Sequence, residues 1–345
     1  MGIHQERLGR DLAEQYHVDE QIKAMDMYAK TVVAGTDVSD TGRFLCTNQL
    51  AECAYYASKG FCKKRLMFMM SNCPLACLMC EEVEEFHRCS GKTHPLDVPS
   101  FVNEVSFASL ENTEGARSIS SYFDKFTNDE GATAVTNPDE PNLYTIENIF
   151  SDVETKEILR LIQGMTEWID SKVQRSDHFD GKYSSPLPVR QSQSLSCEDP
   201  DLACYNKTMD MMSKISTKLD IPEIYFENPE FVHYSPGGHY SPHYEYRIHD
   251  EWKPAGPRVL TVYIPLTDQF SDSIQGGSIG FPGLQWTVLT PKKGSIVVWS
   301  NLDENHVPIS SVETEILPIT SGDHYIFVTH VHLHDYKRNF KMNCS

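Results

Sequence analysis

The segment from Tyr234 to Glu245 contains the residue types best suited to chemistry, because a histidine and a carboxylate stand two positions apart in it. Side chains two positions apart on a β-strand point to the same face, so a strand would bring His243 and Glu245 together. An imidazole and a carboxylate are two of the three donors of the facial triad that holds non-haem Fe(II) and leaves positions open for a co-substrate and dioxygen. The pair alone is common, and its surroundings decide how it is interpreted.

The elements that would position this pair are strands, because the apolar pattern changes to a period of two after Ile221. We expect strands at 231–234, 258–265, 295–299 and 324–334, separated by Gly/Pro turns.

Two helices precede these strands. A capping box runs from Ser151 to Glu154 and predicts a helix start. Its expected buried stripe consists of Ile158, Leu161, Ile162, Met165 and Ile169. The second helix is expected at 202–219, with Met209, Met212 and Ile215 facing inward. Helices followed by a series of strands predict an α+β domain with helices packed on one face of a jelly roll.

Composition excludes several classes of protein. The 345 residues include 49 acidic and 30 basic ones, for a net charge of −19, which argues against a nucleic-acid partner. Apolar residues make up 40% of the chain, enough to bury a core. No run of about 18 apolar residues is present, so we expect no transmembrane segment.

Ten cysteines indicate an oxidising compartment. Six of them are unevenly spaced with a single short couple, unlike the paired couples of a zinc module. These six are Cys46, Cys53, Cys62, Cys73, Cys77 and Cys80. Glycosylation sequons at Asn206 and Asn343 agree with a glycoprotein that is secreted or resides in the lumen of the secretory pathway.

The other four cysteines suggest two further disulfides. Cys197 and Cys204 are seven positions apart, so a local bridge is plausible, and Cys89 with Cys344 would then be the remaining pair.

The chain is expected to have four parts. Residues 1–45 form a helical or extended segment with Leu8, Leu12 and Tyr16 at helical spacing, and 46–89 form the cysteine module. Residues 90–140 are rich in Ser, Asn, Asp and Glu and are expected to be a linker or wrapping segment, and 141–345 form the large domain.

The cysteine module resembles the ShK-toxin (ShKT) domain, most specifically in its closing Cys73-x3-Cys77-x2-Cys80. This resemblance implies the nested pairs Cys46–Cys80, Cys53–Cys73 and Cys62–Cys77, which the sequence alone does not choose among fifteen connectivities. Some relatives block potassium channels with a Lys-Tyr pair, whereas Lys63 and Lys64 here have no adjacent tyrosine. We therefore expect a docking module for an extracellular protein partner.

The large domain resembles the prolyl 4-hydroxylase branch of the 2-oxoglutarate/Fe(II) dioxygenases from about residue 141 to residue 334. The segments that carry this likeness are 189–192, 234–245, 258–264, 276–282, 291–299 and 318–324. The resemblance implies a double-stranded β-helix and an oxidoreductase that uses Fe(II), 2-oxoglutarate and ascorbate.

Some family positions are matched in this sequence. His243 stands at the first iron ligand, and Glu245 stands where the family usually has aspartate. Tyr234 matches a tyrosine that contacts 2-oxoglutarate in relatives, and Thr261 lies on a strand that lines the same pocket.

Two other positions depart from the family. The distal iron-binding histidine falls on Thr314, and threonine is a poor Fe(II) ligand. The lysine that anchors 2-oxoglutarate falls on His324, whose imidazole is shorter and mostly neutral at pH 7.

Other histidines are candidate substitutes for the missing ligand. His306 precedes Thr314 by eight residues, and His330 shares a strand face with His324, His332 and His334 that should point into the barrel. A polar core without metal is the alternative interpretation of that face. His239 and His249 are expected at the surface.

Two functions remain open. One is a pseudoenzyme that keeps the fold and binds a Pro-rich or hydroxyproline-type polypeptide, with no cofactor bound. The other is an active peptidyl-proline 4-hydroxylase with a substitute histidine ligand. The incomplete iron and co-substrate positions favour the first.

Overall fold

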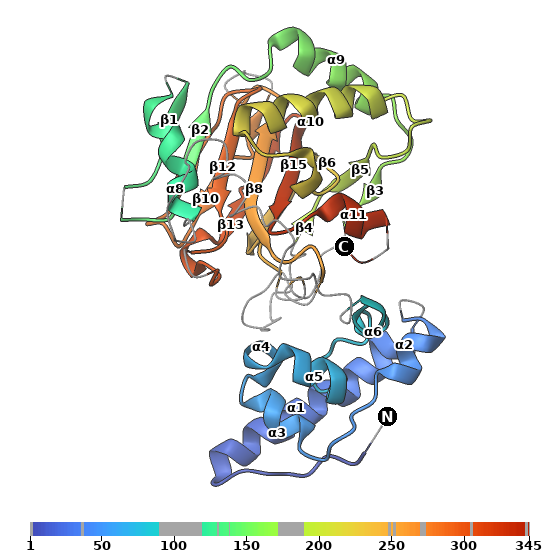
Figure 1. The fold of residues 1–345 in the computed structure, drawn as a ribbon. Coiled ribbons are helices and arrows are strands. Elements are labelled where there is room, and N and C mark those ends of the chain that lie inside the picture. Colours follow the sequence, from blue (N-terminus) through green and yellow to red (C-terminus); the bar gives the residue numbers. More distant parts are fainter. Residues whose placement is uncertain are drawn as a thin grey trace. The chain divides into compact units, whose positions relative to one another are not determined.

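The structure is a computed structural model that divides into two compact units (Figure 1). It describes residues 3–35, 38–89, 119–129, 131–137, 139–171, 190–247, 250, 253–269, 274–303, 306–341 and 344. The small unit comprises Met1–Pro95, Trp252–Pro254 and Cys344, and the large unit comprises the rest. No helix in the described part of the chain has the length and apolar composition needed to cross a membrane.

The small unit is helical. Its elements are α1 (Leu12–Tyr28), the π-helical turn η1 (Ala29–Val33), α2 (Asp40–Leu45), α3 (Cys53–Ser58), α4 (Phe61–Lys64), α5 (Leu66–Asn72) and α6 (Val83–Cys89). Helix α1 buries Val18, Met25 and Tyr28. The face expected to be apolar is instead turned outward, with Leu12 83% exposed and Tyr16 also exposed, because the disulfide core packs against the other side of the helix.

The structure contains all five expected disulfides. They join Cys46 to Cys80, Cys53 to Cys73, Cys62 to Cys77, Cys89 to Cys344 and Cys197 to Cys204. The first three are nested within the small unit, where a short chain has little apolar surface to bury and cross-links compensate for it.

The large unit is built from two main antiparallel sheets. The eight-stranded sheet has the order β1-β2-β12-β8-β15-β6-β5-β3, the five-stranded sheet has the order β11-β10-β13-β7-β4, and β14 pairs with β9. The strands of the larger sheet are β1 (Ala132–Ala134), β2 (Leu143–Ile146), β3 (Ile169–Asp170), β5 (Gln193–Ser196), β6 (Glu230–Tyr234), β8 (Arg258–Pro265), β12 (Ile296–Ser300) and β15 (His324–His332). The remaining strands are β4 (Arg190–Gln191), β7 (His239–His243), β9 (Gln275–Gly276), β10 (Ile279–Phe281), β11 (Thr287–Leu289), β13 (Thr314–Ile316) and β14 (Ile319–Ser321).

Neighbouring strands are mostly distant in sequence, as in a jelly roll: β12 lies between β2 and β8, and β15 lies between β8 and β6. The helices of this unit are α8 (Ile119–Phe123), η3 (Asp124–Asn128), α9 (Asp152–Gln163), α10 (Tyr205–Leu219), η5 (Glu223–Tyr225), η7 (Ser310–Val312) and α11 (Tyr336–Lys341). The expected fold class, an α+β jelly roll with a small disulfide-rich domain, is confirmed.

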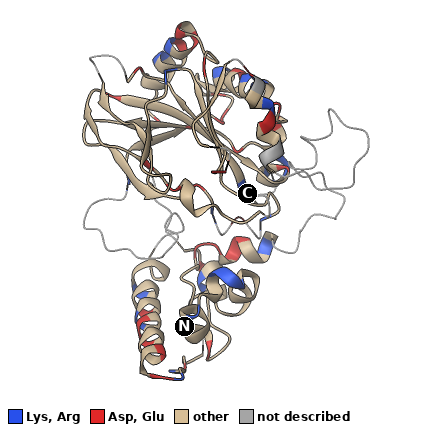
Figure 2. Ribbon diagram, turned by 90° about the vertical axis from the view of Figure 1, so that its left-hand side faces the viewer, with Lys and Arg blue, Asp and Glu red and all other residues tan. Residues whose placement is uncertain are grey.

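Two apolar cores lie on the two sides of the large sheet. Helices α9 and α10 cover one face (Figure 1), and their Ile158 and Ile215 pack with Val262 and Phe327 of the strands. The second core contains residues of both sheets and surrounds the interior of the barrel. In the described part of the chain, charged residues concentrate on the helices and are sparser on the strands (Figure 2).

The expected strands at 231–234, 258–265, 295–299 and 324–334 correspond to β6, β8, β12 and β15 within two residues at each end. Helix α9 begins at the expected capping box but ends at Gln163, because Gly164 follows. Of the expected stripe, Ile158 and Ile162 are buried, Leu161 and Met165 are half-buried, and Ile169 lies on β3 and is 60% exposed.

Helix α10 begins at Tyr205, immediately after the Cys197–Cys204 disulfide. Met212 and Ile215 are buried as expected, whereas Met209 is only half-buried.

The segment expected to be a linker contributes structure to the large unit where it is described. Strand β1 pairs with β2, and Tyr122, Phe123 and Phe126 pack in the main core.

Replacing Ser151 with alanine removes the half of the α9 capping box in which the Ser151 hydroxyl accepts from the backbone N–H of Glu154. The backbone N–H at position 151 can still donate to the Glu154 carboxylate. We expect Ser151→Ala to lower the free energy of unfolding by about 1 kcal/mol. Chemical denaturation of the purified chain measures the change. Ser213→Ala, on an exposed position inside α10, is the control and should leave stability unchanged or slightly raised. Equal losses in the two variants would contradict the capping role.

Candidate functional site

A cavity of about 350 Å³ lies between the two sheets of the large unit. Its walls include Tyr234, Tyr240, Trp299 and Ile316 of the inner core, and charged residues project into it from several strands. The site expected from the sequence belongs to this cavity, since His243 and Glu245 both line it.

Strands β7 and β13 bring Thr314 directly opposite His243. Both side chains are buried and line the cavity. The hydroxyl oxygen Oγ1 of Thr314 has no hydrogen-bond partner among the described residues. The side chain that faces His243 across the ladder is therefore a neutral hydroxyl.

The His243 ring is fixed on several sides. Its Nδ1 is hydrogen-bonded to the carbonyl of Ser241 at 2.9 Å, and its Nε2 lies 3.1 Å from Oε1 of Glu245. The ring stacks on Tyr240 with 3.5 Å between centroids, and the guanidinium of Arg190 lies 4.7 Å from the centre of the same tyrosine.

Glu245 is surrounded by groups that favour its charged form. Oε2 lies 2.9 Å from Nε2 of His330, and the Arg258 guanidinium comes within 3.7 Å of the same oxygen. Burial alone raises the pKa of Glu245, but its hydrogen bonds to His243 and His330 outweigh burial and hold that pKa well below the usual range. The carboxylate is therefore charged and lies between the two imidazoles.

A second buried carboxylate continues this network. Arg258 donates two hydrogen bonds to Glu227, at 2.6 and 2.7 Å, and Nε2 of His332 lies 2.6 Å from the same carboxylate. Nδ1 of His330 lies 3.3 Å from Glu227, so His330 stands between Glu227 and Glu245. Burial raises the pKa of Glu227, but Arg258 and His330 hold it well below the usual range.

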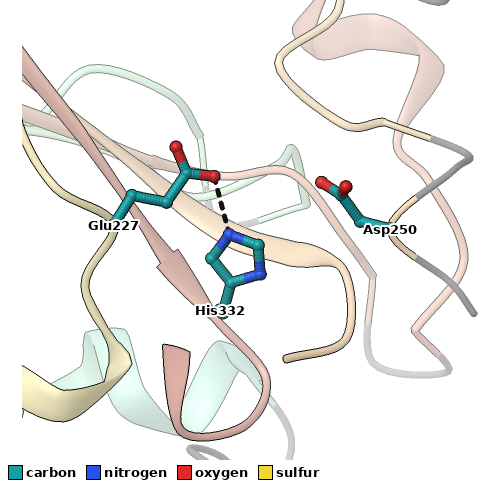
Figure 3. Close-up of side chains that lie close together, drawn as sticks. All are labelled: Glu227, Asp250 and His332. Carbon is teal, nitrogen blue, oxygen red and sulfur yellow. Dashed lines mark hydrogen bonds and ion pairs between the residues drawn. The ribbon is translucent and has the colours of Figure 1, made fainter. Parts of the chain in front are cut away.

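Glu227, Asp250 and His332 also place ligand atoms within 4.8 Å of one another, as a metal site would (Figure 3). The two hydrogen bonds from Arg258 already supply a cation to Glu227 at this position. We therefore interpret the group as an ion-pair network.

His324 is buried at the start of β15, where it pairs with Tyr234 of β6. Its Nδ1 lies 2.8 Å from the Thr267 hydroxyl, and its Nε2 lies 3.1 Å from the Tyr263 hydroxyl and 3.3 Å from the Gln269 amide. Burial lowers the pKa of His324 to about 3, so the ring is neutral at pH 7. It does not line the cavity.

Comparison with known proteins agrees with this architecture. Residues 45–80 match the model of the ShK domain-like family. The chain is 25% identical over 223 residues to the probable prolyl 4-hydroxylase 7 of Arabidopsis thaliana, covering 58% of this chain and 65% of that protein. It is 28% identical over 219 residues to the prolyl 4-hydroxylase subunit alpha-3 of Bos taurus, covering 60% of this chain and 36% of that protein.

The chain is thus similar to ShK domains over residues 45–80 and to prolyl 4-hydroxylases over 58–60% of its length. It spans less than two thirds of the length of either relative. Among solved structures, the viral collagen prolyl hydroxylase of Paramecium Bursaria Chlorella virus-1, in its 2OG complex, is 19% identical with a TM-score of 0.41. That match covers 55% of this chain and 95% of the viral one.

The side chains of this domain do not fit the Fe(II) and 2-oxoglutarate that its likeness implies. A ferrous facial triad needs two imidazoles and a carboxylate around one point. Here a threonine, Thr314, lies opposite His243. The Glu245 carboxylate lies between the rings of His243 and His330 and contacts both, so the three groups do not surround a common point. At the lysine position, the neutral His324 supplies no permanent cation for a second carboxylate.

The other expected residues lie in different surroundings. Tyr234 lines the cavity, and burial raises its pKa to about 12. Thr261 is buried and exchanges hydrogen bonds with the amide of Asn301. His306 lies on an exposed turn and is not among the cavity-lining residues, so the structure does not bring it to the site. His330 is brought to the site.

Two expected surface features are described. Asn206 is exposed in the first turn of α10, and His239 is half-buried. His249 and Asn343 lie outside the described residues.

Sequence reasoning missed the partners that complete this network. Glu227 and Arg258 are 31 positions apart, and their pairing depends on which strands become neighbours. The one available signal was an arginine at the start of an apolar strand, since a cation there requires an anion once the strand is buried.

Removing the Arg258 guanidinium should leave the negative charge of the buried Glu227 carboxylate without its cationic partner. We expect Arg258→Met to lower the free energy of unfolding by about 3 kcal/mol or more, as for other buried ion pairs that lose one member. Denaturant titration measures the loss. Lys207→Met breaks the exposed pair with Glu157 and should cost less than about 1 kcal/mol. Similar losses of unfolding free energy in both variants would show that the buried ion pair contributes no more to stability than the exposed one.

His324 predicts a pH dependence of stability. Its pKa is about 3 in the folded chain and about 6.5 when unfolded, so between these values the unfolded chain binds a proton that the folded chain does not. Stability should therefore fall as pH falls from 6.5 toward 3, by up to about 1.4 kcal/mol per pH unit from this group.

The difference in unfolding free energy between wild type and His324→Gln, measured from pH 7 to pH 5, isolates this contribution. The exposed His306→Gln is the control and should retain the wild-type slope. A His324→Gln slope identical to wild type would contradict burial of a neutral ring.

Proposed function

We propose that this chain binds an extended Pro-rich polypeptide in the cavity of its prolyl 4-hydroxylase-like domain without hydroxylating it. The observation that carries this proposal is the strand register that places Thr314 opposite His243. A threonine hydroxyl is a weak Fe(II) donor, so the site lacks its second histidine at the position where the fold would supply it.

The electrostatics support the same proposal. Glu245 has His243, His330 and Arg258 as partners, so its charge is compensated by the protein itself. His324 is neutral and hydrogen-bonded to its own neighbours. The protein therefore offers no cation at this position to anchor a dicarboxylate co-substrate.

The cavity walls suit a polyproline II chain. Such a chain exposes prolyl rings and carbonyl oxygens that its own backbone does not satisfy. Tyr234, Tyr240 and Trp299 provide aromatic surface for the rings, and Arg190 provides donors for carbonyls. The groove can therefore recognise a Pro-rich ligand without a metal.

We further propose that the protein is secreted or resides in the lumen of the secretory pathway. Five disulfides support an oxidising compartment, and Asn206 is exposed where a glycan could be attached. The ShK-like domain would dock an extracellular protein partner.

One observation favours a second function, an active peptidyl-proline 4-hydroxylase using Fe(II), 2-oxoglutarate and ascorbate. His243 and His330 contact the two oxygens of one carboxylate, so two imidazoles and one carboxylate, the donor types of a facial triad, already meet. If Glu245 rotated away from the line between the rings, His330 would be the substitute ligand.

Metal titration and turnover distinguish the two functions. We expect no stoichiometric binding of Mn(II) or Fe(II) by anaerobic calorimetry, and no succinate from 2-oxoglutarate with a Pro-rich peptide, because the third ligand is missing. The same peptide should bind the metal-free chain. Stoichiometric metal binding that His243→Ala abolishes, together with succinate formation, would establish the enzyme instead.

A gain-of-binding variant provides the matched control. The triple substitution Thr314→His, Glu245→Asp and His324→Lys restores the family residues at three positions and should acquire Mn(II) binding. If the wild type already binds the metal as tightly as this variant, the proposal fails.

A further inference from the structure

Three cavity-lining residues have a buried polar atom without a hydrogen-bond partner among the described residues. They are Thr314 (hydroxyl Oγ1), Trp299 (indole Nε1) and Arg247 (guanidinium Nε), and the first two are neutral groups. The two residues are 2% and 1% exposed, and both line the cavity. Buried polar groups in folded proteins are nearly always hydrogen-bonded, so an unpaired pair beside a cavity points to a ligand that completes them.

Strand pairing and side-chain hydrogen bonds connect the two residues through the Glu245 network. Trp299 on β12 is the cross-strand partner of Thr261 on β8, and Thr261 is in turn the cross-strand partner of His330 on β15. His330 bonds to Glu245, which bonds to His243, the cross-strand partner of Thr314. The hydroxyl and the indole come from different sheets, and both residues line the cavity that also contains the Glu245 network.

The chemistry of these two groups defines what they can receive. An indole N–H only donates, and a threonine hydroxyl both donates and accepts. A ligand hydroxyl matches both, because it can accept from Trp299 while it exchanges a hydrogen bond with Thr314. The neighbouring carboxylates already have partners, because Glu227 accepts from Arg258 and Glu245 lies against His330 and Arg258.

We infer that the cavity recognises a 4-hydroxyproline residue of an extended polypeptide in preference to proline. This inference rests on the proposed function, which places a prolyl ring in the cavity, and it goes further by assigning the ring's 4-hydroxyl to Trp299 and Thr314. An unmodified proline ring in the same place would leave both polar groups unpaired, and a site built to bond a hydroxyl discriminates strongly against the analogue that lacks it. The chain would thus bind the product of prolyl 4-hydroxylation.

Calorimetry with the full disulfide-bonded chain tests this inference. The probes are short oligomers of 4-hydroxyproline, of proline and of (4R)-4-fluoroproline, which keeps the ring pucker of hydroxyproline but has no O–H. We expect the hydroxyproline oligomer to bind at least about tenfold more tightly than the other two, the effect of one buried hydrogen bond.

Variants assign the preference to the two residues. Thr314→Val keeps side-chain volume, and Trp299→Phe removes the indole N–H with a smaller ring. Each should reduce the preference for hydroxyproline, whereas Thr314→Ser retains a hydroxyl and should preserve it. Trp286→Phe, at a tryptophan that is 69% exposed, is the matched control and should behave as wild type. Circular dichroism of each variant checks that it is folded.

The outcomes separate this inference from the proposed function. Equal binding of hydroxyproline and proline oligomers, or of hydroxyproline and fluoroproline oligomers, overturns the inference and leaves the proposed function intact. A preference that survives both Thr314→Val and Trp299→Phe also overturns it. Absence of binding to all three oligomers contradicts both, and hydroxylation of the proline oligomer contradicts the proposed function itself.

Discussion

Burying a carboxylate between two sheets is costly unless cations face it, and the interior of this barrel depends on how Glu245 meets that requirement. His243 comes from the smaller sheet, while His330 and Arg258 come from adjacent strands of the larger one. The two sheets are therefore joined at this level by charge-assisted hydrogen bonds. Through Arg258 and His330, the same network extends to the second buried carboxylate, Glu227.

The compensation of Glu245 comes from the protein's own side chains, because the Arg258 guanidinium lies within 3.7 Å of its carboxylate. Thr314 and His324 are both neutral, so neither leaves an unbalanced charge in the interior. The cavity has aromatic walls, and Arg190 and Arg247 also line it.

The two units are stabilised by different means. The small unit has short helices, and buried cysteines form part of its core, as expected where little apolar surface is available. The large unit has apolar clusters on both faces of its main sheet, and its Cys197–Cys204 disulfide closes only a local loop before α10. The cavity of the large unit is lined by residues of the second core, and no described residue of the main core under the helices is among its lining residues.

The sequence by itself determined the strands and the start of α9, because these depend on local period and on a capping motif. The nested cysteine pairs and the four positions His243, Glu245, Thr314 and His324 followed from its resemblance to known families, since the spacing alone leaves the pairing open. Tertiary structure alone decided that His330 reaches Glu245 while His306 remains exposed, that Arg258 pairs with Glu227, and that Ile169 leaves the helix for an exposed strand. These contacts join residues far apart in the chain, and their partners follow from which strands become neighbours in the barrel, which no local pattern specifies.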